Sequence, residues 1–136
     1  MAKKSVQEKY NDEKHVKVEI LEKGFSDLNA GDKMFIASPK IIANYIDQIP
    51  KGKSVSIITM RKDIALEHNA DNTCPLTTGI FLRIVAEKNY EDYKNGKINR
   101  LTPFWRVIYP DSPLLKKLPF SGFITEQQHK EKLFAN

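Results

Sequence analysis

The residues best suited to chemistry stand together at positions 101–108, which read Leu-Thr-Pro-Phe-Trp-Arg-Val-Ile. Phe104 and Trp105 carry aromatic rings, which can stack on an unpaired base. Arg106 follows them directly and can neutralise a phosphate. The segment offers no nucleophile with a neighbouring base, so these residue types favour binding over catalysis.

Basic residues are concentrated in two segments of a chain whose formal net charge is +5. Residues 51–62 hold cations and no acid, namely Lys51, Lys53, Arg61 and Lys62. Residues 97–117 hold five cations against Asp111 alone. Both segments suit an anionic partner such as nucleic acid. A second interpretation, given equal weight on charge alone, is that both are solvated surface loops.

A long helix is predicted between the two basic segments, from about Pro75 to Tyr93. Thr73 or Cys74 would cap it, and Pro75 fits its first turn. At about 100° per residue an apolar arc faces inward, formed by Ile80, Phe81, Leu82, Ile84, Val85 and Ala86. The edge expected to stay exposed carries Leu76, Gly79, Arg83, Glu87 and Tyr90.

Gly79 lowers the helix propensity of this segment by about 1 kcal/mol relative to alanine. Two explanations stay open: another backbone, of protein or nucleic acid, approaches Gly79 closely, or Gly79 packs against a neighbouring helix.

Shorter elements are expected on both sides of the long helix. Alternation over residues 16–20 predicts a strand or an extended arm. Ser38 and Pro39 open a helix that ends at Pro50. We further expect an extended segment at 55–58, a helix over 61–68 capped by Thr59, a mostly extended stretch at 100–109, and a C-terminal helix capped by Thr125.

These elements predict a mainly α fold within the α+β class. We expect an N-terminal extension at residues 1–33 and one domain at residues 34–136, since 136 residues suffice for a single core. The single cysteine, Cys74, excludes an internal disulfide and fits a reducing cytoplasm. No apolar run is long enough to span a bilayer, and we expect no membrane association, no metal and no cofactor.

Four motifs in order resemble the DNA-binding domain of O6-alkylguanine-DNA alkyltransferases and their alkyltransferase-like relatives, over residues 38–134. Residues 49–53, Ile-Pro-Lys-Gly-Lys, are similar to the family's I-P-x-G-x turn. Residues 77–83, Thr-Thr-Gly-Ile-Phe-Leu-Arg, are similar to the A-V-G-x-A-x-R of its recognition helix. Residues 103–107, Pro-Phe-Trp-Arg-Val, are similar to P-C-H-R-V, and Ser121-Gly122 resembles an S-G-G element.

The resemblance implies a winged helix-turn-helix fold whose recognition helix enters the minor groove of DNA. It implies that Thr77, Thr78 and Gly79 face the groove and that Arg83 contacts phosphate, although the helical wheel turns the two threonines away. Leu76 corresponds to the arginine that fills the gap left by a flipped base. Apolar wedges such as leucine can also enter base steps.

Two departures from the family decide the expected activity. Phe104 stands at the position of the acceptor cysteine, and Trp105 at that of the neighbouring histidine, so transfer of a methyl group to this site is excluded. Both rings could line a base pocket, or they could fill a core vacated by the lost active site. Cys74 is expected to be a buried or capping thiol.

We therefore expect a non-catalytic, monomeric protein that binds double-stranded DNA, with O6-alkylguanine as a candidate lesion and a repair protein as a further partner. Its predicted DNA contacts are Lys51, Lys53, Leu76, Thr77, Thr78, Gly79, Arg83 and Arg106. The alternative is a protein-interaction module that kept the fold and lost DNA binding, which Leu76 favours. An enzyme ranks lowest.

Overall fold

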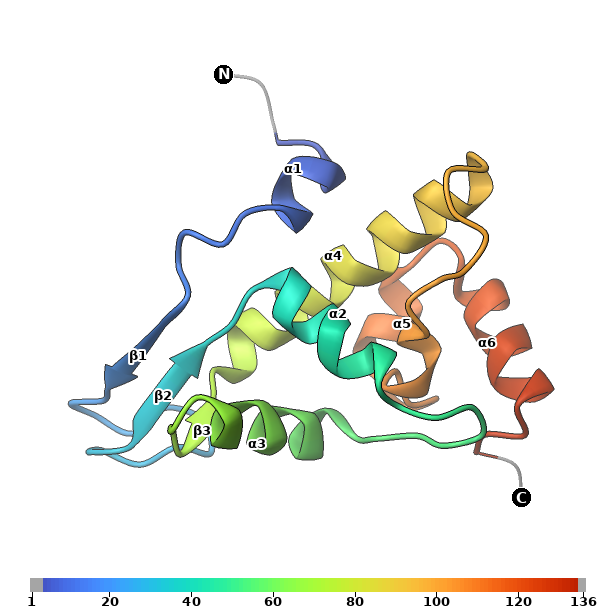
Figure 1. Cartoon of the computed structure of the whole chain (residues 1–136). Helices are drawn as coiled ribbons and strands as arrows, with labels where there is room; N and C mark the ends of the chain where they lie inside the picture. Colours follow the sequence, from blue (N-terminus) through green and yellow to red (C-terminus); the bar gives the residue numbers. More distant parts are fainter. Residues whose placement is uncertain (1–3, 135–136) are drawn as a thin grey trace.

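The fold is built around the long helix α4 (Pro75–Lys94) in the computed structural model, which describes residues 4–134 (Figure 1). Pro75 occupies its first turn and Cys74 is its N-cap residue, without a side-chain capping bond. Asn95 is the C-cap residue, and Gly96 follows with a φ of +71°, a left-handed conformation that suits glycine. The predicted helix and both of its ends are confirmed.

Two shorter helices precede α4. α2 (Pro39–Asp47) begins as predicted, because the Ser38 hydroxyl accepts a hydrogen bond from Ile41 N–H at 3.2 Å. α3 (Ile57–Glu67) begins earlier than predicted. The Ser56 hydroxyl accepts from Thr59 N–H at 3.1 Å, so Thr59 lies within the first turn instead of capping it. The extended segment expected at 55–58 is therefore wrong over its second half.

Three strands form a small sheet at one end of the molecule, with β1 at its outer edge (Figure 1). β1 (Lys17–Ile20) confirms the strand predicted at 16–20 and pairs antiparallel with β2 (Lys33–Ile36), with Val18 opposite Phe35. β2 pairs in parallel with β3 (Asn72–Thr73), with Phe35 opposite Thr73. The strand pairings thus connect the N-terminal region to the start of α4.

The N-terminal segment packs against the rest of the chain, and the predicted boundary after residue 33 falls inside β2. α1 (Val6–Tyr10) contacts α4: Gln7 Nε2 donates to Asp92 Oδ1 at 2.8 Å, and Lys88 Nζ lies 4.6 Å from the centre of the Tyr10 ring. The segment before β2 is held by a two-bond ion pair, Arg61 to Asp27, at 2.7 and 2.9 Å.

The C-terminal third holds two short helices that were not predicted, one of them inside the stretch expected to be extended at 100–109. Residues 104–106 form the 3-10 helix η1 (Phe104–Arg106), and α5 (Pro113–Lys117) was not predicted. α6 (Ser121–Lys130) begins with Phe120 as N-cap residue, so the predicted cap at Thr125 is wrong. The α+β class is confirmed. A wing is not, since no strand follows α4 among residues 4–134.

The larger of two apolar clusters joins the helices to the sheet. Its fully buried side chains come from β2, from the helices α2, α3, α4 and α6, and from η1 and the residues after it, and include Phe35, Ile42, Ile46, Met60, Leu82, Val85, Phe104, Ile108 and Ile124. Each such side chain contributes roughly 1.5–3 kcal/mol when removed from water. The core fixes α4 on its inner side and leaves the outer side of its N-terminal half uncovered.

Candidate nucleic-acid interface

The exposed edge of α4 carries Leu76, Ile80 and Arg83. The side chains of Leu76 and Ile80 are 62% and 50% exposed, and Arg83 is exposed as well. The prediction that Ile80 belongs to the buried arc is wrong. Ile80 lies one helical turn after Leu76 and therefore shares its face. The core-facing positions of this half of the helix are instead Thr78 and Leu82, both fully buried.

A groove lies beside this edge, between α4, the start of α3 and α5, and encloses about 380 Å³. We call it the α4–α5 groove. Apolar side chains form most of its lining, namely Ile57, Leu76, Ile80 and Leu114. Arg83 and Lys117 are its charged residues, and no acidic side chain lines it. The Arg83 Nε lies 3.7 Å from Glu87 Oε2, a loose contact in which both partners keep solvent exposure.

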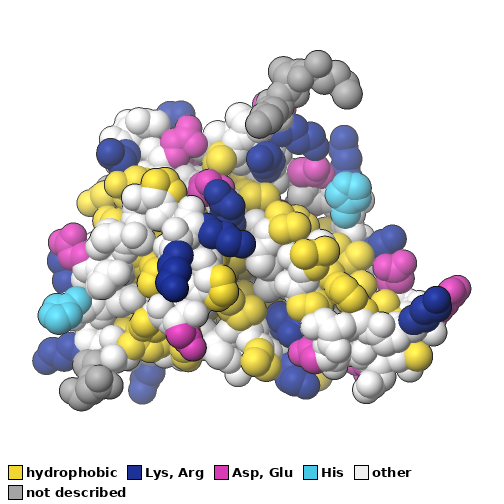
Figure 2. Space-filling model, turned by 180° about the vertical axis from the view of Figure 1, so that it is seen from behind, with side chains coloured by type: hydrophobic (Ala, Val, Ile, Leu, Met, Phe, Trp, Pro, Cys, Tyr) yellow, Lys and Arg dark blue, Asp and Glu magenta, His cyan; other side chains and the backbone are white. Residues whose placement is uncertain are grey.

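The side of the molecule that holds α5 carries the same mixture of basic and apolar side chains as the groove. α5 lies at the rear of the view in Figure 1. Figure 2, seen from behind, shows Lys and Arg side chains interspersed among hydrophobic ones, with fewer acidic side chains between them. Such a surface combines cations for an anionic backbone with apolar groups for base edges or for another protein.

Gly79 lies at the middle of the exposed edge and is partly exposed to solvent. A Cβ atom built on it would meet no atom within 4 Å beyond its chain neighbours and the nearby backbone of α4 itself. Packing against a neighbouring helix, one of the two explanations for this glycine, is therefore wrong. The backbone of α4 is left uncovered at Gly79, so a partner can approach it closely.

The two threonines before Gly79 do not face the groove as the resemblance implied. Thr78 is fully buried, and its hydroxyl donates to the Cys74 carbonyl at 2.6 Å, within the first turn of α4. The Thr77 hydroxyl is buried and has no hydrogen-bond partner among the described residues. The direct prediction from the helical wheel, which turned both away from the exposed edge, agrees better with the structure.

Arg106 is committed to contacts inside the protein, which contradicts its predicted phosphate contact. Its Nε and one terminal nitrogen donate to the two carboxylate oxygens of Glu131, each at 2.9 Å. The other terminal nitrogen donates to the Ile49 carbonyl at 2.7 Å. The side chains of Arg106 and Glu131 are both nearly buried. The arginine thus joins η1 to α6 and to the end of α2.

Glu131 also accepts hydrogen bonds from Trp105 Nε1 at 2.7 Å and from Gly52 N–H at 2.9 Å. Burial alone would raise the pKa of Glu131. The donors Arg106, Gly52 and Trp105 favour its charged form and hold the pKa below its ordinary value. Periodicity could not indicate this carboxylate, since its partners lie far away in the sequence.

Phe104 and Trp105 belong to the core, so the predicted base pocket is wrong. Phe104 is fully buried and Trp105 nearly so. Phe120 and Phe123 occupy the space beside Phe104, with ring centres at 6.0 and 6.4 Å from its own. Trp105 lies edge-on to Phe104 at 5.4 Å. Both rings therefore help to fill the core, as the second of the two interpretations expected. The lost active site that this interpretation assumed stays a prediction.

Lys51 and Lys53 are exposed but lie apart from the α4–α5 groove. They flank Gly52, whose φ of +83° makes a tight turn and whose N–H is bonded to Glu131. Figure 1 shows this turn beside the end of α6, at the opposite end of the molecule from the sheet. The structure therefore brings Leu76, Gly79 and Arg83 together and separates both lysines from them.

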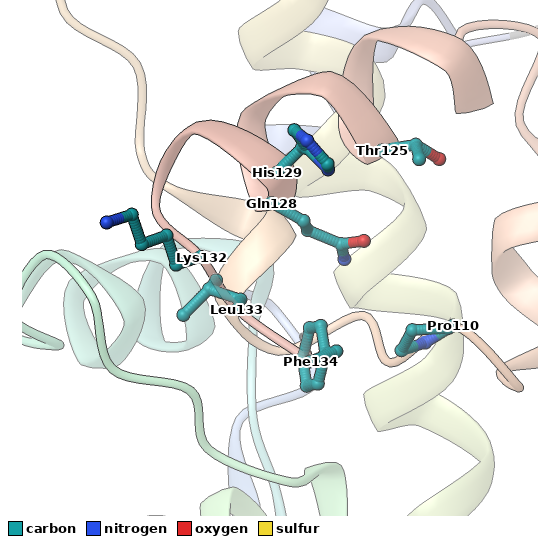
Figure 3. Close-up of a pocket in the computed structure, with 7 residues that line it drawn as sticks. All are labelled: Pro110, Thr125, Gln128, His129, Lys132, Leu133 and Phe134. Atoms are coloured by element: carbon teal, nitrogen blue, oxygen red, sulfur yellow. The ribbon is translucent and has the colours of Figure 1, made fainter. Parts of the chain in front are cut away.

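A second hollow, of about 640 Å³, lies at the C-terminal end of α6 (Figure 3). It is lined by Pro110, Thr125, Gln128, His129, Lys132, Leu133 and Phe134, and neither Phe104 nor Trp105 contributes to it. The Gln128 amide donates to the carbonyls of Trp105 and Ile108 at 3.0 and 2.6 Å, so its main role is to hold η1. The sequence did not indicate this hollow, because Pro110 and the residues of α6 are separated in the sequence and come together only in the folded chain.

Comparison with known proteins gives no family. No protein-family model, no curated protein and no solved structure matches the chain. Within residues 4–134 no cluster of His, Cys, Asp or Glu could hold a metal ion, and no helix there is long and apolar enough to cross a membrane. Cys74 is a buried free thiol, as expected.

Proposed function

We propose that this chain is a non-catalytic DNA-binding protein that contacts double-stranded DNA through the α4–α5 groove. The observation that carries the proposal is the uncovered N-terminal half of α4, where an open Gly79 lies between apolar side chains and Arg83. The resemblance to the alkyltransferase-like family, in which this segment is the recognition helix, agrees with that placement. α3 and α4 would then act as the helix-turn-helix pair.

Each part of the groove has a role in this proposal. Arg83 and Lys117 neutralise phosphates on one strand, which is the salt-dependent component of DNA binding. Leu76 and Ile80 enter the minor groove as apolar wedges between base steps. Gly79 lets the sugar-phosphate backbone approach α4 without meeting a side chain.

The proposal includes no flipped base. A base extruded into the position beside Phe104 would have to displace the ring of Phe120, which lies in the core, and that of Phe123, which packs against the core. Unstacking a base costs a few kcal/mol. Because the interior is already filled, no contacts inside a pocket would offset this cost. We therefore expect equal affinity for duplexes with and without O6-methylguanine.

Fluorescence anisotropy with these two duplexes, each titrated at two salt concentrations, tests the proposal. The expected result is binding that weakens steeply with salt and does not distinguish the lesion. Preference for the lesion would show that a base reaches the interior and would contradict the arrangement proposed for Phe104. Absence of binding at low salt would reject DNA binding altogether.

Single variants locate the surface. Arg83→Ala and Lys117→Ala are each expected to lower affinity and to reduce the salt slope by about 1. Lys130→Ala is the matched control. Lys130 is exposed on α6, away from the groove, and its substitution removes the same charge from the protein. An equal loss in the control would mean that binding is a nonspecific effect of net charge.

A protein-interaction module is the second candidate, and the apolar exposure on α3 and α4 favours it. Ile58 is 61% exposed at the start of α3, in addition to Leu76 and Ile80 on α4. Exposed apolar patches of this kind commonly mark protein-binding surfaces. This candidate predicts no DNA binding at low salt.

A further inference from the structure

Strand β1 is exposed on both faces and along one edge. All four of its residues are solvent-exposed, with Val18 at 44% and Ile20 at 67%. β1 is a terminal strand of the sheet order β1-β2-β3, and Figure 1 shows no element on its outer side. An uncovered edge strand with apolar residues is a template for pairing with another strand.

The backbone groups on this edge can be assigned from the register. Leu21 N–H donates to the Asp32 carbonyl at 3.0 Å, which continues the pairing of β1 with β2. Hydrogen-bonded and non-bonded positions alternate along an antiparallel pair. The backbone N–H and C=O groups of Lys17 and Glu19 therefore point toward β2, whereas those of Val18 and Ile20 point outward.

The side chains of β1 are complementary to a second copy of the same strand. Val16, Val18 and Ile20 lie on one face, and Lys17 and Glu19 lie on the other. In an antiparallel pair with Val18 on the two-fold axis, Val16 lies opposite Ile20 on the apolar face. On the polar face each Lys17 lies opposite the Glu19 of the other copy, which gives one such pair on each side of the axis.

We infer that β1 pairs antiparallel with β1 of a second copy of this chain, forming a two-fold dimer with a continuous six-stranded sheet. Val18 donates to and accepts from its symmetry mate, and Ile20 donates to the Val16 carbonyl of the other copy. The register places apolar side chains together and opposite charges together, both favourable cross-strand pairs. It also pairs the outward N–H and C=O groups of Val18 and the outward N–H of Ile20, whereas the Val16 N–H already donates to the Glu13 carbonyl at 3.4 Å.

The dimer is weak and depends on concentration, so it departs from the expected monomer only at high protein concentration. A pair of short strands buries less than the about 1,200 Å² at which stable interfaces begin. Sedimentation velocity of the full chain, from micromolar to millimolar concentration, is expected to show a reversible monomer–dimer equilibrium. A chain that stays monomeric over this whole range would overturn the inference.

Charge exchange tests the register itself. Lys17→Glu places acids opposite each other, and Glu19→Lys places lysines opposite each other, so each variant alone is expected to weaken the dimer by about tenfold. An equimolar mixture of the two restores opposite charges at every pair and is expected to recover the dimer. The double variant Lys17→Glu/Glu19→Lys is expected to dimerise as well as the natural chain.

Both positions are exposed on the strand, so folding is preserved and circular dichroism of each variant checks it. A dimer that persists unchanged in both single variants would assign the interface to another surface. Single variants that are monomeric but fail to recover on mixing would reject this pairing register.

Discussion

At the level of single residues, Glu131 contributes most to the connections between distant segments. It receives donors from η1 and from the turn after α2, so a carboxylate near the end of the chain fixes both. A nearly buried ion pair contributes little net stability by itself, since desolvation offsets its attraction. Breaking it is costly because the remaining partner is left charged and unpaired.

Replacing Glu131 by glutamine is accordingly expected to lower the free energy of unfolding by about 3 kcal/mol. The glutamine amide would point a donor at Arg106 and Trp105, which are donors themselves. Urea unfolding at neutral pH measures the change. Glu126→Gln is the matched control, since that carboxylate is exposed and its pair with Lys130 contributes less than about 0.5 kcal/mol. Equal effects in the two variants would show that the Glu131 network is not stabilising.

Phe104 is the residue for which the resemblance and the structure diverge most. Phe104→Ala is expected to lower the free energy of unfolding by about 4 kcal/mol, because it opens a cavity in a fully packed region. Phe25→Ala, at an exposed phenylalanine, should cost less than about 1 kcal/mol. A stable Phe104→Ala protein with altered preference for alkylated DNA would instead restore the pocket interpretation.

At the level of elements, local signals at the helix ends predicted α2 and α4. Ser38-Pro39 and Pro75 mark the starts of α2 and α4, and Asn95-Gly96 marks the end of α4, all through contacts within a few residues. The start of α3 was misplaced because Ser56 and Thr59 are both capping residue types, and only the geometry shows which one accepts.

Elements held by distant contacts were not predictable in this way. η1 takes its shape from Arg106, Glu131 and Gln128, and β3 exists only because it meets β2. The candidate site shows the same difference between features set by local spacing and features set by distant contacts. The exposed edge at Leu76, Gly79 and Arg83 came from helical spacing, whereas the internal role of Arg106 depends on a residue 25 positions away.

Gly79 gives a prediction about α4 as an element. Gly79→Ala is expected to raise the free energy of unfolding by up to about 1 kcal/mol, because the new methyl group meets no atom and alanine favours the helix. The same variant is expected to weaken DNA binding if the DNA backbone closes on this position. Gly122→Ala in α6 is the matched control, since its Cβ is equally unobstructed. Loss of affinity in both variants, or in neither, would remove Gly79 from the interface.

At the level of the whole molecule, ionisable groups with shifted pKa values lie in the N-terminal segment, between α2 and α3, and at the end of α6. The pKa of Asp12 is lowered to about 2 by hydrogen bonds from Lys14 N–H and the Lys4 ammonium, and the Arg61 guanidinium lowers that of Asp27. Burial raises the pKa of Tyr45, and its hydrogen bond to Asp63 raises it further. These groups lie in different parts of the fold, so pH acts on the molecule at several places at once.

The stability of the whole chain is therefore expected to be highest over a broad neutral range and to fall at both ends. Carboxylates with a lowered pKa, Glu131 among them, contribute stability above their unfolded pKa of roughly 4, and that contribution is lost as the pH falls through the folded values. Tyr45, whose pKa is raised, contributes below its unfolded pKa of about 10 and loses this contribution as the pH rises further. Urea midpoints measured across the pH range test both limbs. Glu131→Gln should reduce the loss of stability at acid pH and leave the loss at alkaline pH unchanged. Tyr45→Phe should reduce the loss at alkaline pH and leave the acid side unchanged. If stability at acid pH falls as steeply in Glu131→Gln as in the natural chain, acid unfolding depends on other carboxylates.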